Sequence, residues 1–226
     1  MKIRLHSAVS VLAAVAAMAA SSGALAQAEG QWAIKAGVGK ITPKVESGDV
    51  SAPALPGSKA AISADTQPVF AVAYGVTDNL TVELDLGLPY KHKISGAGAI
   101  EGVGVLGTVK ALPPTLFVYH RFYEPEARFR PYLGVGATYA YFADETGSGK
   151  LTTLSDIGGP PTTFSLKNKF AATLQVGLIV NINKKWFVDG NISKTWLKTK
   201  VSFSSGQTQD MTLNPQAVTL ALGYKF

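Results

Sequence analysis

One segment of strictly alternating side chains limits most strongly what this chain can fold into. From Leu80 to Tyr90, an apolar or aromatic residue stands at every second position, and threonine, acidic residues and glycine fill most positions between them. A period of two is that of a β-strand and not that of a helix, whose apolar residues recur every three or four positions. At about 3.3 Å per residue the segment is long for a soluble strand, but it suits a tilted strand that crosses a membrane.

The same alternation recurs, with varying strength, in seven other segments. These are residues 32–41, 68–76, 115–122, 129–141, 170–182, 186–197 and 217–226. Short connections (77–79, 124–128 and 183–185) alternate with long ones (42–66, 91–110, 143–167 and 198–214). Outer-membrane barrels have this asymmetry, with short periplasmic turns and longer outer loops. We therefore predict an all-β fold, an eight-stranded antiparallel transmembrane β-barrel with four long outer loops.

The polar face of these segments favours a membrane barrel over a soluble, lipocalin-like one. In a soluble barrel the polar face meets water, whereas in a membrane barrel it lines the interior. Here that face carries mainly small or uncharged residues, such as Gly134, Thr173 and Asn191, which suit a narrow interior. Aromatic residues such as Trp32 and Trp186 lie near the segment ends, as in the girdles at membrane interfaces. We expect the apolar face to meet lipid.

The N-terminus predicts export. Lys2 and Arg4 precede an apolar run from Ala8 to Ala20, and Ala24-Leu25-Ala26 has the pattern of a signal peptidase site. The run is shorter than the roughly 20 residues of a membrane helix, so an N-terminal anchor is the less favoured alternative. We predict a signal peptide over residues 1–26, a barrel over residues 27–226 and a location in the outer membrane.

Composition excludes several kinds of partner. The chain has no cysteine, which rules out disulfides and thiolate metal sites. Its formal net charge of +6 is scattered, without a basic stripe interleaved with aromatics, so we expect no nucleic-acid partner. No other spacing resembles a metal site, and Gly102-Val-Gly104 lacks the strand–turn–helix context of a nucleotide loop. We expect no metal and no cofactor.

Three motifs resemble a known family. They are Leu112-Pro-Pro-Thr115, Pro131-Tyr132-Leu-Gly134-Val-Gly136 and the closing Leu222-Gly-Tyr224-Lys-Phe226. With their order and spacing, the chain resembles the OmpW family of small outer-membrane proteins, which includes AlkL. The resemblance implies an eight-stranded barrel with a narrow channel for small hydrophobic molecules. It also implies that some members act as bacteriocin receptors or in stress responses.

The histidines do not form a catalytic set. His6 would leave with the signal peptide, and His120 lies on the apolar face near Phe122, where an amphipathic ring suits the interface. His92 is predicted in a loop, and we interpret it as a solvated histidine. A Ser–His–Asp arrangement with Ser95 is the alternative, but nothing supplies its third member. We predict that the protein is not an enzyme.

The polar face supplies the candidate channel lining. Glu83 and Asp85 share this face, and they could serve acid–base chemistry or bind a cation, but we favour lumen charges paired with Arg130. The predicted lining residues are Glu83, Asp85, Thr115, Tyr119, Arg130, Tyr132, Gln175, Asp189 and Asn191.

Two local features carry further predictions. Pro113 and Pro114 cannot donate to a strand ladder, so they mark a plain strand start or a gap through which an apolar ligand leaves sideways into lipid. Tyr224 and Phe226 end the last strand and resemble the signal by which barrels are handed to the outer-membrane assembly machinery.

Together these features predict a passive channel for small hydrophobic molecules. Its expected partners are outer-membrane lipid, the barrel assembly machinery and small hydrophobic solutes. Apolar residues in the long connections favour a channel, since 52–55, 100–106 and 151–157 are too apolar for purely solvated loops. The alternative is a plugged barrel that acts as a surface receptor or structural protein, because eight strands enclose a space that side chains can fill.

Overall fold

The computed structural model describes residues 29–51, 56–155 and 157–226. The predicted signal peptide and the apolar segment 52–55 lie outside the described residues.

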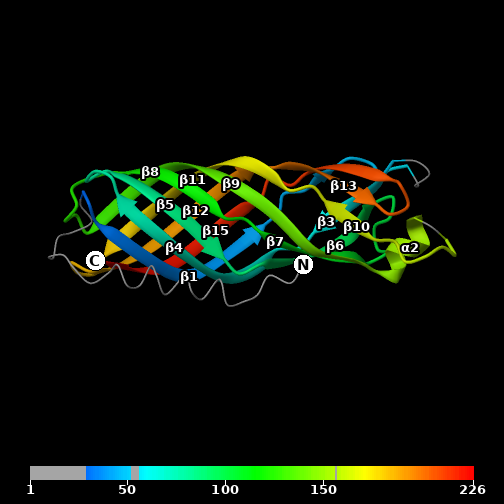
Figure 1. The fold of residues 1–226 in the computed structure, drawn as a ribbon, viewed down its shortest axis with the longest axis horizontal. Helices are drawn as coiled ribbons and strands as arrows, with labels where there is room; N and C mark the ends of the chain where they lie inside the picture. The colour runs from blue at the N-terminus through cyan, green and yellow to red at the C-terminus, as the bar shows by residue number, and fades with distance from the viewer. Residues whose placement is uncertain (1–28, 52–55, 156) are drawn as a thin grey trace.

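Eight strands close into an antiparallel barrel, which confirms the predicted fold (Figure 1). They are β1 (Trp32–Thr42), β4 (Asp65–Gly75), β5 (Leu80–Gly87), β8 (Thr115–Arg121), β9 (Phe129–Gly147), β11 (Lys169–Asn181), β12 (Trp186–Trp196) and β15 (Gln216–Lys225). Each pairs with the next in this order, and β15 pairs with β1 to close the ring. Closure leaves no unpaired edge, which a sheet needs if it is to sit in lipid.

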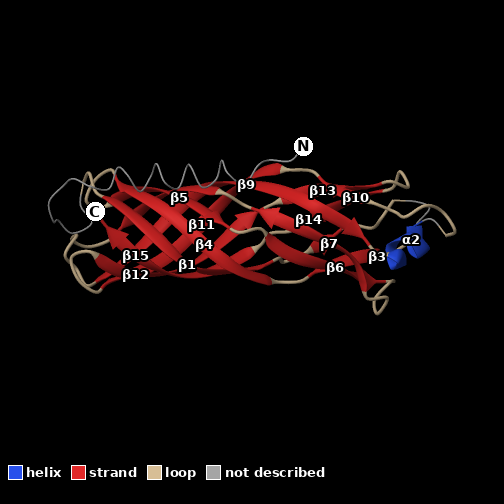
Figure 2. Ribbon diagram, turned by 60° about the horizontal axis from the view of Figure 1, so that its bottom comes forward, coloured by secondary structure: helices blue, strands red, loops and turns tan. Residues whose placement is uncertain are grey.

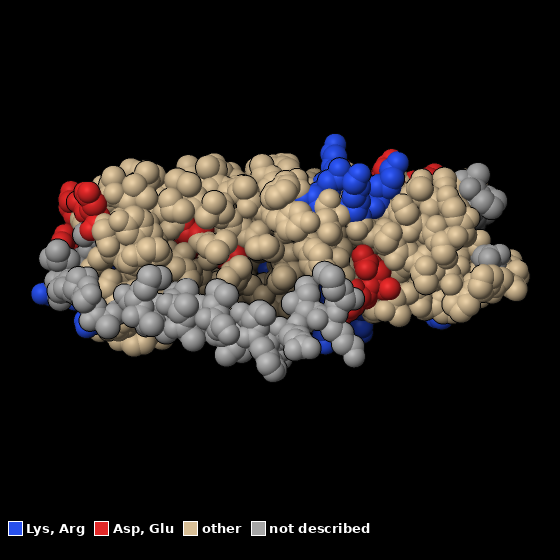
Figure 3. Space-filling model, viewed as in Figure 1, with Lys and Arg blue, Asp and Glu red and all other residues tan. Residues whose placement is uncertain are grey.

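The two faces of the barrel strands differ as the alternation predicts. Leu84, Val135 and Leu220 point outward and are 39%, 63% and 59% exposed. Glu83 and Gln175, one residue from outward-facing neighbours, are buried in the interior. Figure 3 shows the same division on the surface, since charged residues gather at the turn end and near the middle of the molecule and leave most of the barrel wall between them uncharged.

The four long connections are not loops, and the structure corrects this prediction. They fold into a second layer of sheet beyond the barrel, the extension, which lies opposite the three short turns (Figure 2). Its strands are β2 (Glu46–Ser47), β3 (Ser58–Ile62), β6 (Tyr90–Gly98), β7 (Val105–Leu112), β10 (Phe164–Leu166), β13 (Lys198–Phe203) and β14 (Thr208–Thr212), with a short helix, α2 (Gly149–Ser155). β3, β6 and β7 join the upper part of β9, and the others form a four-stranded sheet.

The extension buries apolar residues inside, the reverse of the barrel. Ile94, Leu106, Phe164 and Met211 belong to one buried apolar cluster. Such a cluster stabilises a sheet whose outer face meets water, because burial removes apolar area from solvent. No helix in the described part of the chain is long and apolar enough to cross a membrane.

His92 is buried inside the extension, so its interpretation as a solvated loop histidine is wrong. The ring is 5% exposed in β6, and its Nδ1 atom is 2.7 Å from the carbonyl oxygen of Ser63. The sequence motif of alternating Tyr90, His92 and Ile94 is itself a short strand pattern, but it lies within a connection that we expected to be irregular.

Candidate functional site

A network of charged side chains fills the middle of the barrel. The Lys35 ammonium lies 2.6 Å from Glu83 Oε1 and 2.7 Å from Asp189 Oδ2. The Tyr119 hydroxyl donates to Glu83 at 3.0 Å, and the Tyr132 hydroxyl donates to Asp189 at 2.9 Å. Both carboxylates are fully buried, and buried charges are tolerated where they are paired and hydrogen-bonded.

The predicted pairing of Glu83 and Asp85 with Arg130 is wrong. The Arg130 guanidinium instead donates to the carbonyl oxygens of Asp78 and Tyr123, at 2.7 and 3.0 Å, in the turns at the end of the barrel. The cation that pairs with Glu83 is Lys35, which the sequence reasoning missed. Lys35 lies on β1 between the outward-facing Ile34 and Ala36. The alternation of this strand therefore predicts that Lys35 faces the lumen, and this pattern could have identified it.

Below the network, side chains fill the barrel down to its turn end. Phe187 and Ile179 are almost completely buried there. Space for the large rings comes from glycines, because a Cβ atom on Gly223 would collide with the Phe187 ring and one on Gly177 with the Tyr132 ring. The straight route along the barrel axis is therefore occupied by protein.

Above the network, four threonine hydroxyls form a chain across four neighbouring strands. Thr115 bonds Thr138 at 2.8 Å, Thr138 bonds Thr173 at 2.6 Å, and Thr173 bonds Thr195 at 2.9 Å. Gln175 follows Thr173 by two residues on the same face of β11. Its Oε1 atom is buried without a hydrogen-bond partner among the described residues.

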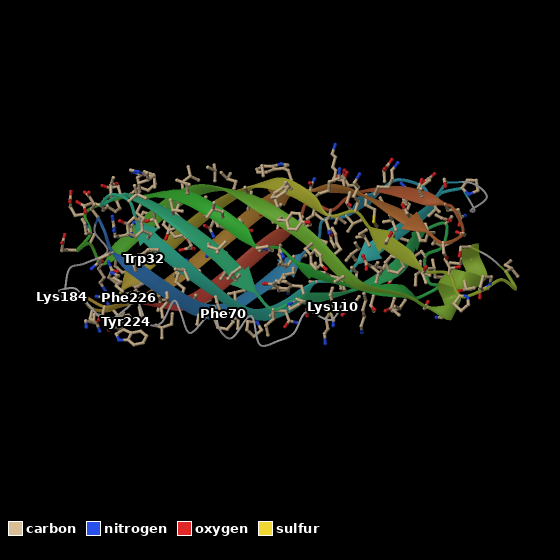
Figure 4. All side chains as sticks on the ribbon, viewed as in Figure 1. Trp32, Phe70, Lys110, Lys184, Tyr224 and Phe226 are labelled. Atoms are coloured by element: carbon tan, nitrogen blue, oxygen red, sulfur yellow. The ribbon has the colours of Figure 1, made fainter. Side chains whose placement is uncertain are left out.

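A cavity of about 120 Å³ lies above the network and extends to the barrel wall. Lys35, Asp85 and Gln175 line its lumen side, and the apolar Ala140 and Leu197 also line it. Its other lining includes Phe70, Leu86 and Pro113. Phe70 and Leu86 are outward-facing residues, 49% and 42% exposed, so the cavity extends to the wall formed by β4 and β5. Figure 4 shows Phe70 projecting from the wall, and Figure 3 shows the wall hollowed in this region.

The cavity borders the part of the wall where the strand ladder is interrupted. Pairing between β5 and β8 ends at Asp85 and Thr115, and pairing between β6 and β7 begins at Tyr90 and Ala111. Pro113 and Pro114 lie in this interval, between β7 and β8. On their other side the wall is continuous, because Tyr139 N donates to the Pro114 carbonyl oxygen at 3.0 Å. The interruption therefore faces β5 alone.

A second cavity, of about 80 Å³, lies in the extension and has a mainly apolar lining. Ile94, Leu106, Leu151, Phe164 and Met211 contribute to it. We call the cavity in the extension the outer cavity and the one beside the network the lower cavity. These residues of the outer cavity belong to the buried apolar cluster, as do Ala140 and Leu197, which line the lower cavity. Apolar side chains thus run without interruption from the outer cavity to the lower one.

Comparison with known proteins identifies the family. The model of the OmpW family matches residues 28–226. The chain belongs to the OmpW family. Outer membrane protein W of Vibrio cholerae serotype O1 is 32% identical over 219 residues, covering 94% of this chain and 96% of the relative. Outer membrane protein AlkL of Ectopseudomonas oleovorans is 29% identical, covering 88% of this chain and 83% of the relative.

A solved structure has the same fold. The crystal structure of the outer membrane protein OprG from Pseudomonas aeruginosa superposes with a TM-score of 0.79, at 24% identity, and covers 89% of this chain and 98% of that one. The OmpW-family barrel therefore lies in the outer membrane, as predicted, with the short turns on the periplasmic side and the extension outside.

The structure divides the nine predicted lining residues of this OmpW-family barrel into three groups. Glu83, Tyr119, Tyr132 and Asp189 form the central network, Asp85, Thr115, Gln175 and Asn191 line the lower cavity, and Arg130 lies at the turn end. Among the described residues, no group of three or more His, Asp or Glu side chains could hold a metal ion.

The two predicted assembly-signal residues lie at the turn end of the OmpW-family barrel, beside Trp32 (Figure 4). Phe226 N donates to the Trp32 carbonyl oxygen at 3.0 Å, which extends the β15–β1 ladder to the last residue. The Tyr224 ring contacts the Trp186 ring, with centroids 4.9 Å apart. Both residues are thus placed at the periplasmic rim.

Proposed function

We propose that this OmpW-family protein is a passive channel through which small hydrophobic molecules enter the outer membrane. A solute binds in the apolar cavity of the extension, descends along the apolar cluster to the lower cavity and leaves sideways between β5 and Pro113–Pro114. The observation that carries this proposal is the lower cavity, which is lined by both lumen residues and the outward-facing Phe70 and Leu86.

The sideways route is the one that suits an apolar solute. Going straight down would require displacing the buried network of Lys35, Glu83 and Asp189, whose charges lose their partners when separated. Going sideways transfers the solute from an apolar-lined cavity into hydrocarbon, so its apolar surface stays out of water. The name of one relative agrees with an apolar cargo: the "Dibenzothiophene metabolism operon protein PahQ" of Pseudomonas aeruginosa, 26% identical over 76% of this chain.

A plugged barrel that acts as a surface receptor or structural protein is the second candidate. The filled lumen between the network and the turn end favours it. The two candidates differ in what closing the side opening does, because a receptor has no use for that opening.

Cross-linking across the opening tests the proposal. The chain has no cysteine, so Leu86→Cys with Pro113→Cys places two unique thiols at the mouth of the lower cavity. A short thiol cross-linker should abolish uptake of dibenzothiophene and alkanes into proteoliposomes with a lipopolysaccharide outer leaflet. The control pair is Val82→Cys with Val118→Cys, which are opposed in the intact part of the β5–β8 ladder. Uptake that survives cross-linking of the first pair would favour the receptor.

Replacing the prolines gives an independent measurement. Pro113→Val with Pro114→Val restores two backbone donors and should favour closure of the ladder toward β5. Hydrophobic uptake should then fall, while heat-modifiable migration and surface display persist. Unchanged uptake in the folded double variant would leave the prolines as a plain strand start.

A further inference from the structure

Four exposed lysines stand together where the barrel wall passes into the extension. They are Lys167, Lys194, Lys198 and Lys200, and Figure 3 shows basic side chains gathered over β13 and the neighbouring strand ends. Their closeness follows from the strand pairing. Lys167 N donates to the Lys200 carbonyl oxygen at 3.1 Å, and Lys194, Lys198 and Lys200 are exposed along the continuous run of β12 and β13.

The outward-facing residues of β12 indicate where these lysines lie relative to the lipid. Ile192 and Trp196 are outward-facing residues of β12, 56% and 49% exposed, and the same alternation continues through Lys198 and Lys200. The outward face thus changes from apolar to basic within a few residues. The Lys194 ammonium lies 5.6 Å from the centre of the Trp196 ring, an arrangement that suits an aromatic residue at the membrane interface. Lysines at this depth reach the layer of lipid headgroups.

The cluster has a surplus of positive charge. Asp210 is its ion-pair partner in the described structure, 3.6 Å from Lys200, and both side chains are more than half exposed. Glu145 lies nearby, and its Oε1 atom accepts a hydrogen bond from Leu166 N. Lys110, near the barrel–extension junction on β7, is instead neutralised by Asp144 at 2.6 Å. Four ammonium groups therefore lie near two carboxylates, Asp210 and Glu145, which leaves an excess of positive charge.

We propose that Lys167, Lys194, Lys198 and Lys200 form a binding site for the phosphate groups of a glycolipid in the outer leaflet. The lysines lie at headgroup depth on the extension side, which faces outward, and phosphate oxygens accept hydrogen bonds from several ammonium groups at once. The site lies on β12, on β13 and at Lys167 between β10 and β11, and β12 is across the barrel from the interval between β5 and β8. A lipid held there leaves the mouth of the lower cavity free.

Lipid binding by the full-length protein in phosphatidylcholine nanodiscs tests this site. The probe is bisphosphorylated lipid A, measured by native mass spectrometry against lipid A from which both phosphates have been removed. An attraction typical of lysines near an anionic surface corresponds to about fivefold in affinity per lysine. Changing all four lysines to Gln should therefore weaken binding at least about tenfold, whereas Asp210→Asn should strengthen it severalfold.

A matched variant separates this site from general basicity. Lys40, Lys59, Lys91 and Lys93 are exposed lysines on other strands, and changing these four to Gln removes the same charge. This variant should bind the probe as the unaltered protein does. Equal losses in the two quadruple variants, or equal binding of dephosphorylated lipid A, would overturn the proposal. Displacement of lipid A by millimolar inorganic phosphate would also overturn it, since the site would then hold free phosphate. Heat-modifiable migration checks that each variant is folded.

Discussion

Lys35 joins three strands of the barrel through its side chain. It lies on β1, while Glu83 lies on β5 and Asp189 on β12, so one ammonium group ties together side chains that are 48 and 154 residues away in sequence. Tyr119 and Tyr132 add one hydrogen bond to each carboxylate. Lys35 is the cation that both carboxylates share, so replacing it leaves each with its tyrosine hydrogen bond but without its ion-pair partner.

Lys35→Met should therefore be strongly destabilising. Without the ammonium group, two carboxylates remain in the interior with no cation beside them, and removal of one partner from a buried pair costs about 3–5 kcal/mol of unfolding free energy. Urea titration of the refolded protein measures the change. Lys40→Met, at an exposed position of the same strand, should change stability by less than about 0.5 kcal/mol. Equal stability of the two variants would contradict the role of the network.

The sequence predicts which face a residue lies on but not which residue it meets. Alternation correctly assigns Glu83 and Asp189 to the interior, because a strand side chain can point to one of two sides. It does not select Lys35 over Arg130 as their partner, since that choice depends on how far each strand is shifted along its neighbour. In the structure, Arg130 lies nearer the turn end and bonds backbone carbonyls there.

The barrel strands could be predicted, whereas the strands of the extension could not. Barrel strands such as β5 meet lipid on one face along their whole length, which enforces strict alternation. Strands of the extension are short, between two and nine residues, and glycines with left-handed backbones lie at their ends, such as Gly98 at the end of β6 and Gly104 just before β7. Their buried apolar residues gather in one cluster from five strands, β6, β7, β10, β13 and β14, a pattern without local periodicity.

The stability of the extension should depend on pH through His92 of β6. Burial lowers the pKa of the His92 ring, and this effect outweighs the contact with the Ser63 carbonyl and the nearby Asp65 carboxylate, which act in the opposite direction. The unfolded segment takes up a proton below about pH 6.5, and the folded one resists it. The contribution is thus fully present above that pH and is lost as the pH falls toward the lowered pKa.

Amide hydrogen exchange in β3 and β6 measures this dependence. Exchange should be faster at pH 5.5 than at pH 7.5 after correction for the intrinsic rate, because local opening reports local stability. His92→Asn should remove most of the difference. A difference that persists in this variant would assign the effect to another group.

Deletion of Phe226 tests the role of the last strand in assembly. In the folded barrel the residue contributes one backbone hydrogen bond, to Trp32, so the truncated protein should refold in detergent with a small loss of stability, about 1 kcal/mol. In cells it should accumulate unfolded in the periplasm if Phe226 belongs to the assembly signal. Phe226→Tyr keeps an aromatic terminus and is the control. Normal amounts of the truncated barrel in outer-membrane fractions would argue against the signal.

As a whole, the molecule combines a filled axis with an opening in its side. The lower cavity lies next to Glu83 and Asp189, two carboxylates that face the single ammonium of Lys35. The resulting excess of negative charge repels anions, because charges interact strongly where water is scarce. The proposed channel should therefore discriminate between solutes of equal chain length by their charge.

A fatty alcohol should enter severalfold faster than the fatty acid of the same length. Uptake of both by proteoliposomes at pH 7.5 gives the ratio. Glu83→Gln removes one carboxylate beside the cavity and should bring the two rates closer together. A ratio that stays the same in this variant would show that selection occurs elsewhere, for example in the outer cavity.

The filled axis has a consequence for the cell that carries the protein. Because the Phe187 ring, the Tyr132 ring and the paired charges around Lys35 occupy the lumen, we expect an inserted barrel to conduct little water and few ions between the two compartments. A high copy number of this barrel should therefore not make the membrane leaky, as many open pores would. We therefore expect that a bacterium can place many copies in its outer membrane without making it leakier to metabolites or water-soluble antibiotics.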